Sequence, residues 1–439
     1  MRFGNLSRQL ASLAGPIFVE TLLVMMLGAV DTFMLSRYSD NSVAAVGVVN
    51  QLMNLVFLLF EVISLGTSIL CSQYIGAGRR DKVVQVVGIS LIFNLLAGLA
   101  ISACLSLFAD DMLNIMGLRP DLMSEGFPYM RIVGGFAFLQ AISLSLSASL
   151  RSADKAKYPM YVAIVVNILN ILGNYTLIFG KFGMPALGVE GAAIATVISQ
   201  LVNLFIMLIT LVRLYKKEER NFAFSIKLGK AGYQQYFVML IPILITEFFW
   251  SLGENVYASV YGHMGTAACA AMTLTNPIQG LMIGALSGLA QAAGILIGKS
   301  LGKEEYDEAY QNAKKLTYYG FVGSLCLSIL LILLRKFYVD IYAVEDSVKL
   351  LAGKVLVAFA FISPVKVLNM ILGGGIIRSG GKTKLVMWID MIGTWGFGVP
   401  LALVTAFVLG MPIYWVYFIL SLEEVIRLLI AVVVFRTKT

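Results

Sequence analysis

Seven of the charged residues within long apolar stretches of this 439-residue chain are candidates for chemistry, because an ionised side chain is costly there. They are Glu20, Asp31, Glu61, Glu247, Glu254, Lys366 and Asp390. A charge at the centre of a bilayer costs about 3 kcal/mol on insertion scales, so such residues normally face a protein interior or a water-filled cavity. Carboxylates in that setting can bind a proton, a metal cation or an organic cation.

Two of these carboxylates share one face of a predicted helix. Glu20 and Asp31 are 11 residues apart, which places them within about 20° of each other and about 16 Å apart along the axis. A later helix carries Asn167, Asn170 and Asn174 on one stripe. Such amides either pack helices together or bind ligands, and the pattern alone leaves both interpretations open.

A third predicted helix combines acids with aromatic residues. Glu247 and Glu254 are seven residues apart, again within about 20° of each other, and Trp250 lies between them. A carboxylate beside an aromatic ring suits a lipophilic cation, through charge pairing and cation–π contact. We therefore expect Glu20, Glu247, Trp250, Glu254 and Tyr257 to contact substrate, although an aromatic residue near the membrane interface is also a common anchor.

The composition identifies the elements that must position these residues. Hydrophobic residues make up 59% of the chain, charged residues 13%, and the mean hydropathy is +0.85. A soluble domain is about 25% charged. This excludes a disordered chain, a nucleic-acid-binding protein despite the net charge of +8, and almost any cytosolic enzyme. The chain is predicted to be an all-α polytopic membrane protein.

Apolar stretches of about 20 residues predict twelve transmembrane helices. Their predicted ranges are 10–37, 43–75, 83–108, 127–150, 159–180, 190–214, 236–262, 266–299, 315–335, 350–376, 384–409 and 412–435. With both termini in the cytoplasm, inner segments hold 23 of the 33 Lys and Arg residues and outer segments hold 7, as the positive-inside rule requires. The outer seven are Arg37, Arg119, Lys181, Arg335, Lys336, Lys349 and Lys354.

The two halves of the chain resemble each other. At an offset of 226 Pro16 matches Pro242, and at an offset of 227 Arg151-Ser152 matches Arg378-Ser379. Each half holds six predicted spans, so the halves form a parallel repeat with one orientation, an architecture found in transporters. We predict an N-lobe at 1–215, a cytoplasmic linker at 216–235 and a C-lobe at 236–439.

Several segments resemble the multidrug and toxic compound extrusion (MATE) family. They are GAVDTFMLSR around Asp31, VAAVGVVNQ, QYIGAGRRDK, SLGKEEYDEA, and the paired loops LRSADKAK and IIRSGGKTK. The resemblance covers nearly the whole chain. It implies a V-shaped pair of six-helix lobes and antiport of organic cations against Na⁺ or H⁺.

The resemblance also implies roles for individual residues. Asp31 would be the cation ligand of the N-lobe, with Asn170 and Asn174 facing it and Thr196 as a hydroxyl ligand. Na⁺ could be held at Asp31, Asn170 and Asn174, whereas a proton needs only Asp31, so both ions remain open. Glu247 would belong to a coupling site in the C-lobe.

Lys366 lies where the family usually has an acid. A Glu247–Lys366 pair would neutralise the C-lobe site, and protonation of Glu247 would break it. Alternatively, Lys366 extends toward the outer surface. Asp390 is given no functional role, and Arg378 and Lys384 are its candidate partners.

We expect a secondary active antiporter that exports amphipathic or cationic drugs and toxic metabolites from a bacterial cell across the inner membrane. No cofactor, resident metal or nucleic-acid partner is expected, and the chain is expected to act as a monomer among membrane lipids. The alternative is a lipid-linked oligosaccharide flippase, which should have cationic residues around pyrophosphate. An enzyme is disfavoured because no nucleophile–base pair or metal-ligand set is present.

Overall fold

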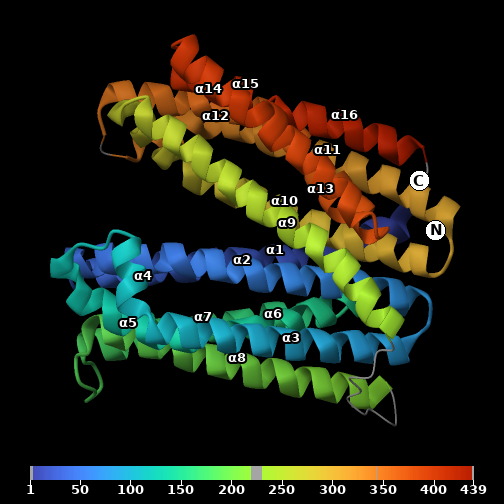
Figure 1. The fold of residues 1–439 in the computed structure, drawn as a ribbon, viewed down its shortest axis with the longest axis horizontal. Coiled ribbons are helices and arrows are strands. Elements are labelled where there is room, and N and C mark those ends of the chain that lie inside the picture. Colours follow the sequence, from blue (N-terminus) through green and yellow to red (C-terminus); the bar gives the residue numbers. More distant parts are fainter. Residues whose placement is uncertain (1–2, 219–229, 343, 438–439) are drawn as a thin grey trace. The chain divides into compact units, whose positions relative to one another are not determined.

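The computed structural model describes residues 3–218, 230–342 and 344–437, and these residues contain helices and no strand. The linker predicted at 216–235 lies largely outside them. The helices of the N-terminal half are drawn in blue to green in Figure 1. They are α1 (Phe3–Ser36), α2 (Asp40–Gly76), α3 (Arg80–Leu107), α4 (Ala109–Ile115), the short 3₁₀ helix η1 (Pro120–Leu122), α5 (Met123–Gly135), α6 (Ala137–Ser152), α7 (Lys157–Phe179) and α8 (Gly188–Glu218).

The C-terminal half, yellow to red in Figure 1, begins with four α-helices in succession and contains π-helical segments in its later part. Its elements are α9 (Lys230–His263), α10 (Thr266–Gly302), α11 (Tyr306–Asp340), α12 (Asp346–Asn369), η2 (Met370–Ile377), α13 (Thr383–Met391), η3 (Ile392–Gly398), α14 (Val399–Leu403), η4 (Val404–Val408), α15 (Ile413–Leu420) and α16 (Glu423–Arg436). Of these, η2, η3 and η4 are π-helical.

The described residues form two compact units. One contains Gly15–Tyr233, and the other contains Met1–Ala14 together with Gln234–Thr439. The predicted lobes at 1–215 and 236–439 differ from these units at the N-terminus. The start of α1 groups with the second unit, and the division falls two residues before Pro16.

Most of the predicted spans are single long helices. Ten helices in the described residues are long and apolar enough to cross a membrane, and the bent pair α5 and α6 makes an eleventh span. The twelfth predicted span, 412–435, is divided between α15 and α16, which are too short to count separately. Glu423 and Glu424 stand at the start of α16, directly after this break.

Each unit has its own apolar core. In the first, Leu35, Phe60 and Met130 are fully buried among residues of α1, α2 and α5. In the second, Phe359 and Val355 of α12 are fully buried against α10 and α15. Because lipid chains are as apolar as these side chains, close packing and not water exclusion holds such helices together.

Glycine residues allow one such close contact. A Cβ atom added at Gly375 in η2 would lie 2.5 Å from the backbone oxygen of Ala290 in α10. A Cβ atom at Gly294 of α10 would in turn lie 3.1 Å from the backbone oxygen of Gly375. The two backbones therefore meet without side chains between them, and this contact fixes η2, which leads directly to Arg378.

Gly375→Ala should therefore destabilise the protein, because the new methyl group overlaps the backbone of α10. Overpacking of this kind costs about 1–3 kcal/mol. Gly373→Ala is the matched control, since a Cβ atom there meets no atom within 4 Å. Thermal unfolding of the purified protein in detergent measures both. Equal unfolding temperatures for the two variants would contradict the proposed contact.

Candidate functional site

A chain of hydrogen bonds links Asp31 of α1 to two amides of α7 and a hydroxyl of α8. Asn174 Nδ2 donates to Asp31 Oδ1 at 2.5 Å and to Asn170 Oδ1 at 3.0 Å. Asn170 Nδ2 then lies 3.3 Å from Thr196 Oγ1. The four residues that were predicted to form the N-lobe site therefore lie together.

Asp31 has no basic partner in the described part of the chain. Its side chain is half-buried, and Asn170 and Asn174 are fully buried. Oδ1 of Asn174 is a buried acceptor that forms no hydrogen bond. Asn167 does not join the chain, because its amide donates to the carbonyl of Ala163 on its own helix. A carboxylate beside an unused amide oxygen can take up a proton or coordinate a small cation.

Unlike Asp31, Glu20 forms an ion pair with a basic residue. Arg151 of α6 holds it with two hydrogen bonds, Nη2 to Oε1 at 2.7 Å and Nε to Oε2 at 3.2 Å. Ser147 Oγ donates to the same Oε1 at 2.9 Å. Paired in this way, the charge of Glu20 is compensated within its own unit, although the sequence alone suggested that it contacts substrate.

The second unit contains an equivalent pair. Arg378 Nη1 donates to Glu247 Oε1 at 3.0 Å. Glu20 and Arg151 are separated by 131 residues, and so are Glu247 and Arg378. The repeat offset of 227 superimposes both members of one pair on the other. The predicted Glu247–Lys366 pair is wrong, because the packing of the helices places Arg378 beside Glu247 and Lys366 beside Glu424.

Lys366 belongs to a larger network that the sequence analysis missed. Its Nζ lies 4.0 Å from Glu424 Oε1, and Asn369 Nδ2 donates to Glu424 Oε2 at 2.8 Å. Arg427 lies 3.7 Å from Glu423 and 3.8 Å from Glu424. The sequence does contain a sign of this network, because three charged residues, Glu423, Glu424 and Arg427, stand within five positions at the start of α16.

Asp390 joins this network to the Glu247–Arg378 pair. Its carboxylate lies 3.6 Å from Arg378 and 3.8 Å from Arg427, so the first of its two expected partners is confirmed. Four carboxylates, those of Glu247, Asp390, Glu423 and Glu424, thus share three cations, those of Lys366, Arg378 and Arg427.

Glycines of η3 make room for this network. A Cβ atom at Gly398 would overlap Glu423 and the hydroxyl of Tyr257, and one at Gly393 would overlap Arg427. Tyr257 is 3% exposed and its hydroxyl donates to Glu423 Oε2 at 2.7 Å. Contact between Tyr257 and a substrate stays a prediction, and it would require the ring to leave Glu423.

The remaining predicted substrate residues lie differently. Trp250 is 37% exposed and Glu254 is also exposed on α9. In the portions of the chain that the structure describes, neither side chain forms a hydrogen bond or ion pair. Both are therefore free to contact a ligand from the face that they share.

Arg151→Gln should lower the thermal stability of the protein more than the double change Glu20→Gln and Arg151→Gln. Removing one partner of a fully buried pair costs about 3–5 kcal/mol, and this partly buried pair should lose less, because the charge left behind is partly screened by solvent, whereas removing both charges is often close to neutral. The unfolding temperatures of the two variants in detergent provide the measurement. A double variant as unstable as the single one would show that charge pairing is not the main contribution.

Comparison with known proteins places this geometry in a family. The family model MatE matches residues 16–176 and 242–404, so that its two parts begin at Pro16 and Pro242, the first residues aligned by the repeat. An uncharacterised transporter of Bacillus subtilis, YisQ, is 32% identical over 413 residues, which are 93% of this chain and 90% of the relative. A probable multidrug resistance protein NorM of Thermotoga maritima is 26% identical, over 94% of this chain and 89% of that protein.

The fold agrees with solved structures. The Vibrio cholerae MATE transporter VcmN in its bent form superimposes with a TM-score of 0.89 at 18% identity, covering 99% of this chain and 98% of that one. A MATE transporter structure in another bent conformation gives a TM-score of 0.88. With the family model matching both halves, the chain belongs to the MATE family of transporters.

Proposed function

We propose that this protein is a secondary active antiporter, which exports amphipathic cations against an inward gradient of H⁺ or Na⁺ through the cluster at Asp31. The observation that carries the proposal is a contrast between embedded acids. Glu20, Glu247 and Asp390 are each paired with arginine, whereas Asp31 accepts a hydrogen bond from a neutral amide and has no basic partner among the described residues. Glu254 is also unpaired there, but it is exposed, whereas Asp31 is half-buried. An acid whose charge no basic side chain compensates is the natural place for a transported cation.

The neighbours of Asp31 suit either coupling ion. Protonation needs only the carboxylate. Na⁺ prefers several oxygen ligands, and the carboxylate, the amide oxygens of Asn170 and Asn174 and the hydroxyl of Thr196 supply four. One of these, Asn174 Oδ1, is without a hydrogen bond. The set contains only one negative charge, which suits a monovalent ion.

Binding of the ion at Asp31 can drive export only if the ion binds the inward-facing and outward-facing states of the protein with different affinity. Rocking of the two six-helix lobes against each other is the motion expected of a parallel repeat. Relatives named multidrug resistance proteins support export of drugs. We further propose that the protein lies in the bacterial inner membrane with both termini in the cytoplasm, which the distribution of basic residues supports.

Trp250 and Glu254 of α9 are the proposed contacts for substrate. They are four residues apart, so they share one helix face, and both are exposed. The ring offers an apolar face with a negative π-surface and the carboxylate offers the opposite charge to a cation. In contrast, the arginines beside the embedded acids, Arg151, Arg378 and Arg427, are engaged with carboxylates, so at these positions no free arginine is offered to the anionic pyrophosphate of the flippase alternative.

Asp31→Asn should abolish ethidium efflux from drug-sensitive bacterial cells, because an amide neither releases a proton nor supplies the negative charge that holds Na⁺. Efflux by wild type is measured with and without added Na⁺, and across a pH gradient. Stimulation by Na⁺ would identify that ion, and dependence on the pH gradient alone would identify H⁺.

The control for this experiment is Asp121→Asn. Asp121 lies in η1, and its exposed carboxylate pairs with Arg119, the residue before η1. This variant should export at the wild-type rate. If Asp31→Asn exported as fast as this control at equal expression, Asp31 would not be the coupling residue. If well-expressed wild type exported no drug, the flippase alternative should be tested next.

Trp250→Ala and Glu254→Gln should each reduce export of lipophilic cations by about tenfold. A cation–π contact that is shielded from water contributes up to about 2 kcal/mol, and a factor of ten corresponds to about 1.4 kcal/mol. Export of a neutral substrate should depend on Trp250 but not on Glu254. Identical losses for neutral and cationic substrates in Glu254→Gln would contradict charge recognition.

A further inference from the structure

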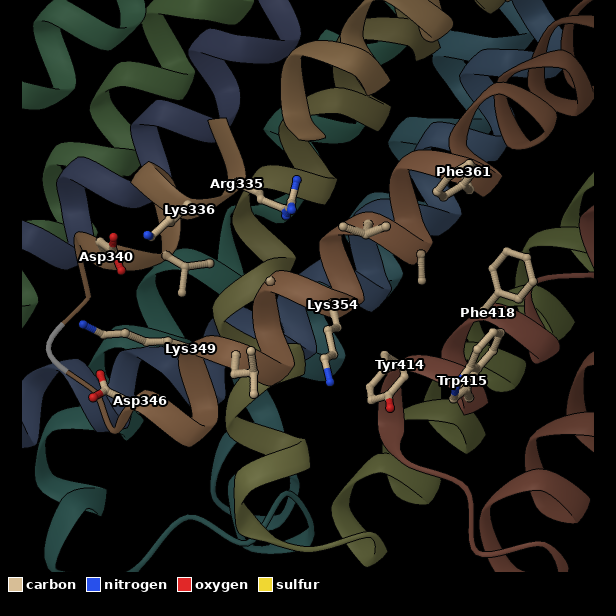
Figure 2. A pocket seen from close by; sticks show the side chains of 15 residues that line it. Arg335, Lys336, Asp340, Asp346, Lys349, Lys354, Phe361, Tyr414, Trp415 and Phe418 are labelled. Atoms are coloured by element: carbon tan, nitrogen blue, oxygen red, sulfur yellow. The ribbon is translucent and has the colours of Figure 1, made fainter. Parts of the chain in front are cut away.

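The second unit contains a groove of about 800 Å³ between α11, α12 and α15 (Figure 2). This volume lies within the usual range of ligand sites. The groove is distant in sequence from every residue of the coupling cluster at Asp31. Four cations line it, namely Arg335, Lys336, Lys349 and Lys354.

The groove is polar at one end and apolar at the other. Figure 2 shows Lys336, Asp340, Lys349 and Asp346 together at one end, and the rings of Phe361, Trp415 and Phe418 at the other. Lys349 and Phe361 are 12 residues apart on α12, which corresponds to about 18 Å along the helix. That distance is about the depth of one leaflet of the hydrocarbon core.

The cations of the groove outnumber its acids. Asp340 and Asp346 are its two carboxylates, so the net charge of the lining is positive. Within the described ranges, no carboxylate lies at ion-pair distance from Lys336, Lys349 or Lys354. Lys354 Nζ instead lies 4.7 Å above the ring of Tyr414. Three ammonium groups are therefore available to an anion.

The position of these cations is unusual for a membrane protein. In the orientation proposed above, they account for four of the seven basic residues in outer segments, although basic residues generally avoid that side. The repeat does not explain them. At an offset of 227 their counterparts in the first half are Phe108, Ala109, Leu122 and Phe127, which carry no charge.

We propose that this groove binds an anionic phospholipid of the outer leaflet. The phosphodiester lies between Lys336, Lys349 and Lys354, and one acyl chain extends along α12 over Val357 to Phe361. A soluble phosphate would use only the charged end and would leave the exposed apolar wall uncovered. A cationic drug is excluded from the charged end by the excess positive charge.

The assignment to the outer leaflet rests on the orientation given under the proposed function, but binding of the lipid does not. Binding is therefore measured on the purified full-length protein in detergent, without transport. Native mass spectrometry compares retention of dioleoylphosphatidylglycerol with that of dioleoylphosphatidylcholine. Inorganic phosphate and glycerol 1-phosphate, each in excess, test whether a free anion competes.

The test variant is Lys336→Gln, Lys349→Gln and Lys354→Gln combined. Its matched control is Arg37→Gln, Arg119→Gln and Lys181→Gln, which removes the same charge from the other outer cations. We expect wild type and control to retain phosphatidylglycerol at least tenfold better than phosphatidylcholine, and the test variant to lose this preference. Elution as a single folded species verifies that all three proteins are intact.

Equal retention of the two lipids by wild type, or an unchanged preference in the test variant, would overturn the proposal. So would displacement of the lipid by inorganic phosphate, which would identify a free-anion site. Labelling of Lys349→Cys in intact cells by an impermeant maleimide, in a background with the four native cysteines replaced by alanine, tests the leaflet separately. Labelling only after the cells are opened would overturn the outer-leaflet assignment, whereas drug efflux tests the proposed function independently.

Discussion

An ionised group in a hydrocarbon environment must be matched by an opposite charge or by hydrogen bonds, and this requirement organises both halves of the protein. Glu20 is matched by Arg151, and Glu247 by Arg378. Each pair joins the middle of the first helix of its half to the end of the fourth span. The same ion pairs that compensate the charges therefore also fix the relative positions of the two helices they join.

In the second half more charged residues are paired, and parts of the helices that carry them are π-helical instead of α-helical. Its network of acids and cations includes Asp390 and the first turn of α16, and the π-helical segments η2 and η3 stand on either side of Asp390. Wider turns are common at functional sites, where a local change in helix geometry re-aims side chains. Here Gly393 and Gly398 of η3 leave space for Arg427 and Glu423, which bulkier residues would fill.

Much of this architecture could be predicted from the sequence. Hydropathy identified the long helices, and residue matches identified the repeat, because both depend on local composition. The cluster of Asp31, Asn170, Asn174 and Thr196 was also predicted, through the family resemblance. The partner of Glu247 was not, because a carboxylate can reach several cations and only the tertiary packing selects Arg378. The break before α16 was missed because the span was identified by its overall hydropathy, although Glu423, Glu424 and Arg427 follow the break directly.

The equal separation of the two Glu–Arg pairs has a consequence for the ancestry of the protein. A pair that recurs at the same spacing in both halves is most simply inherited from the single half-length chain that was duplicated. The cluster at Asp31 does not recur in this way. Repeat offsets of 226 and 227 place Tyr257 opposite Asp31 and Glu423 opposite Thr196, and these two residues are themselves hydrogen-bonded. Both halves therefore carry a polar cluster at corresponding positions, but its acid stands on the first span in one half and on the last span in the other, where Arg427 pairs with it.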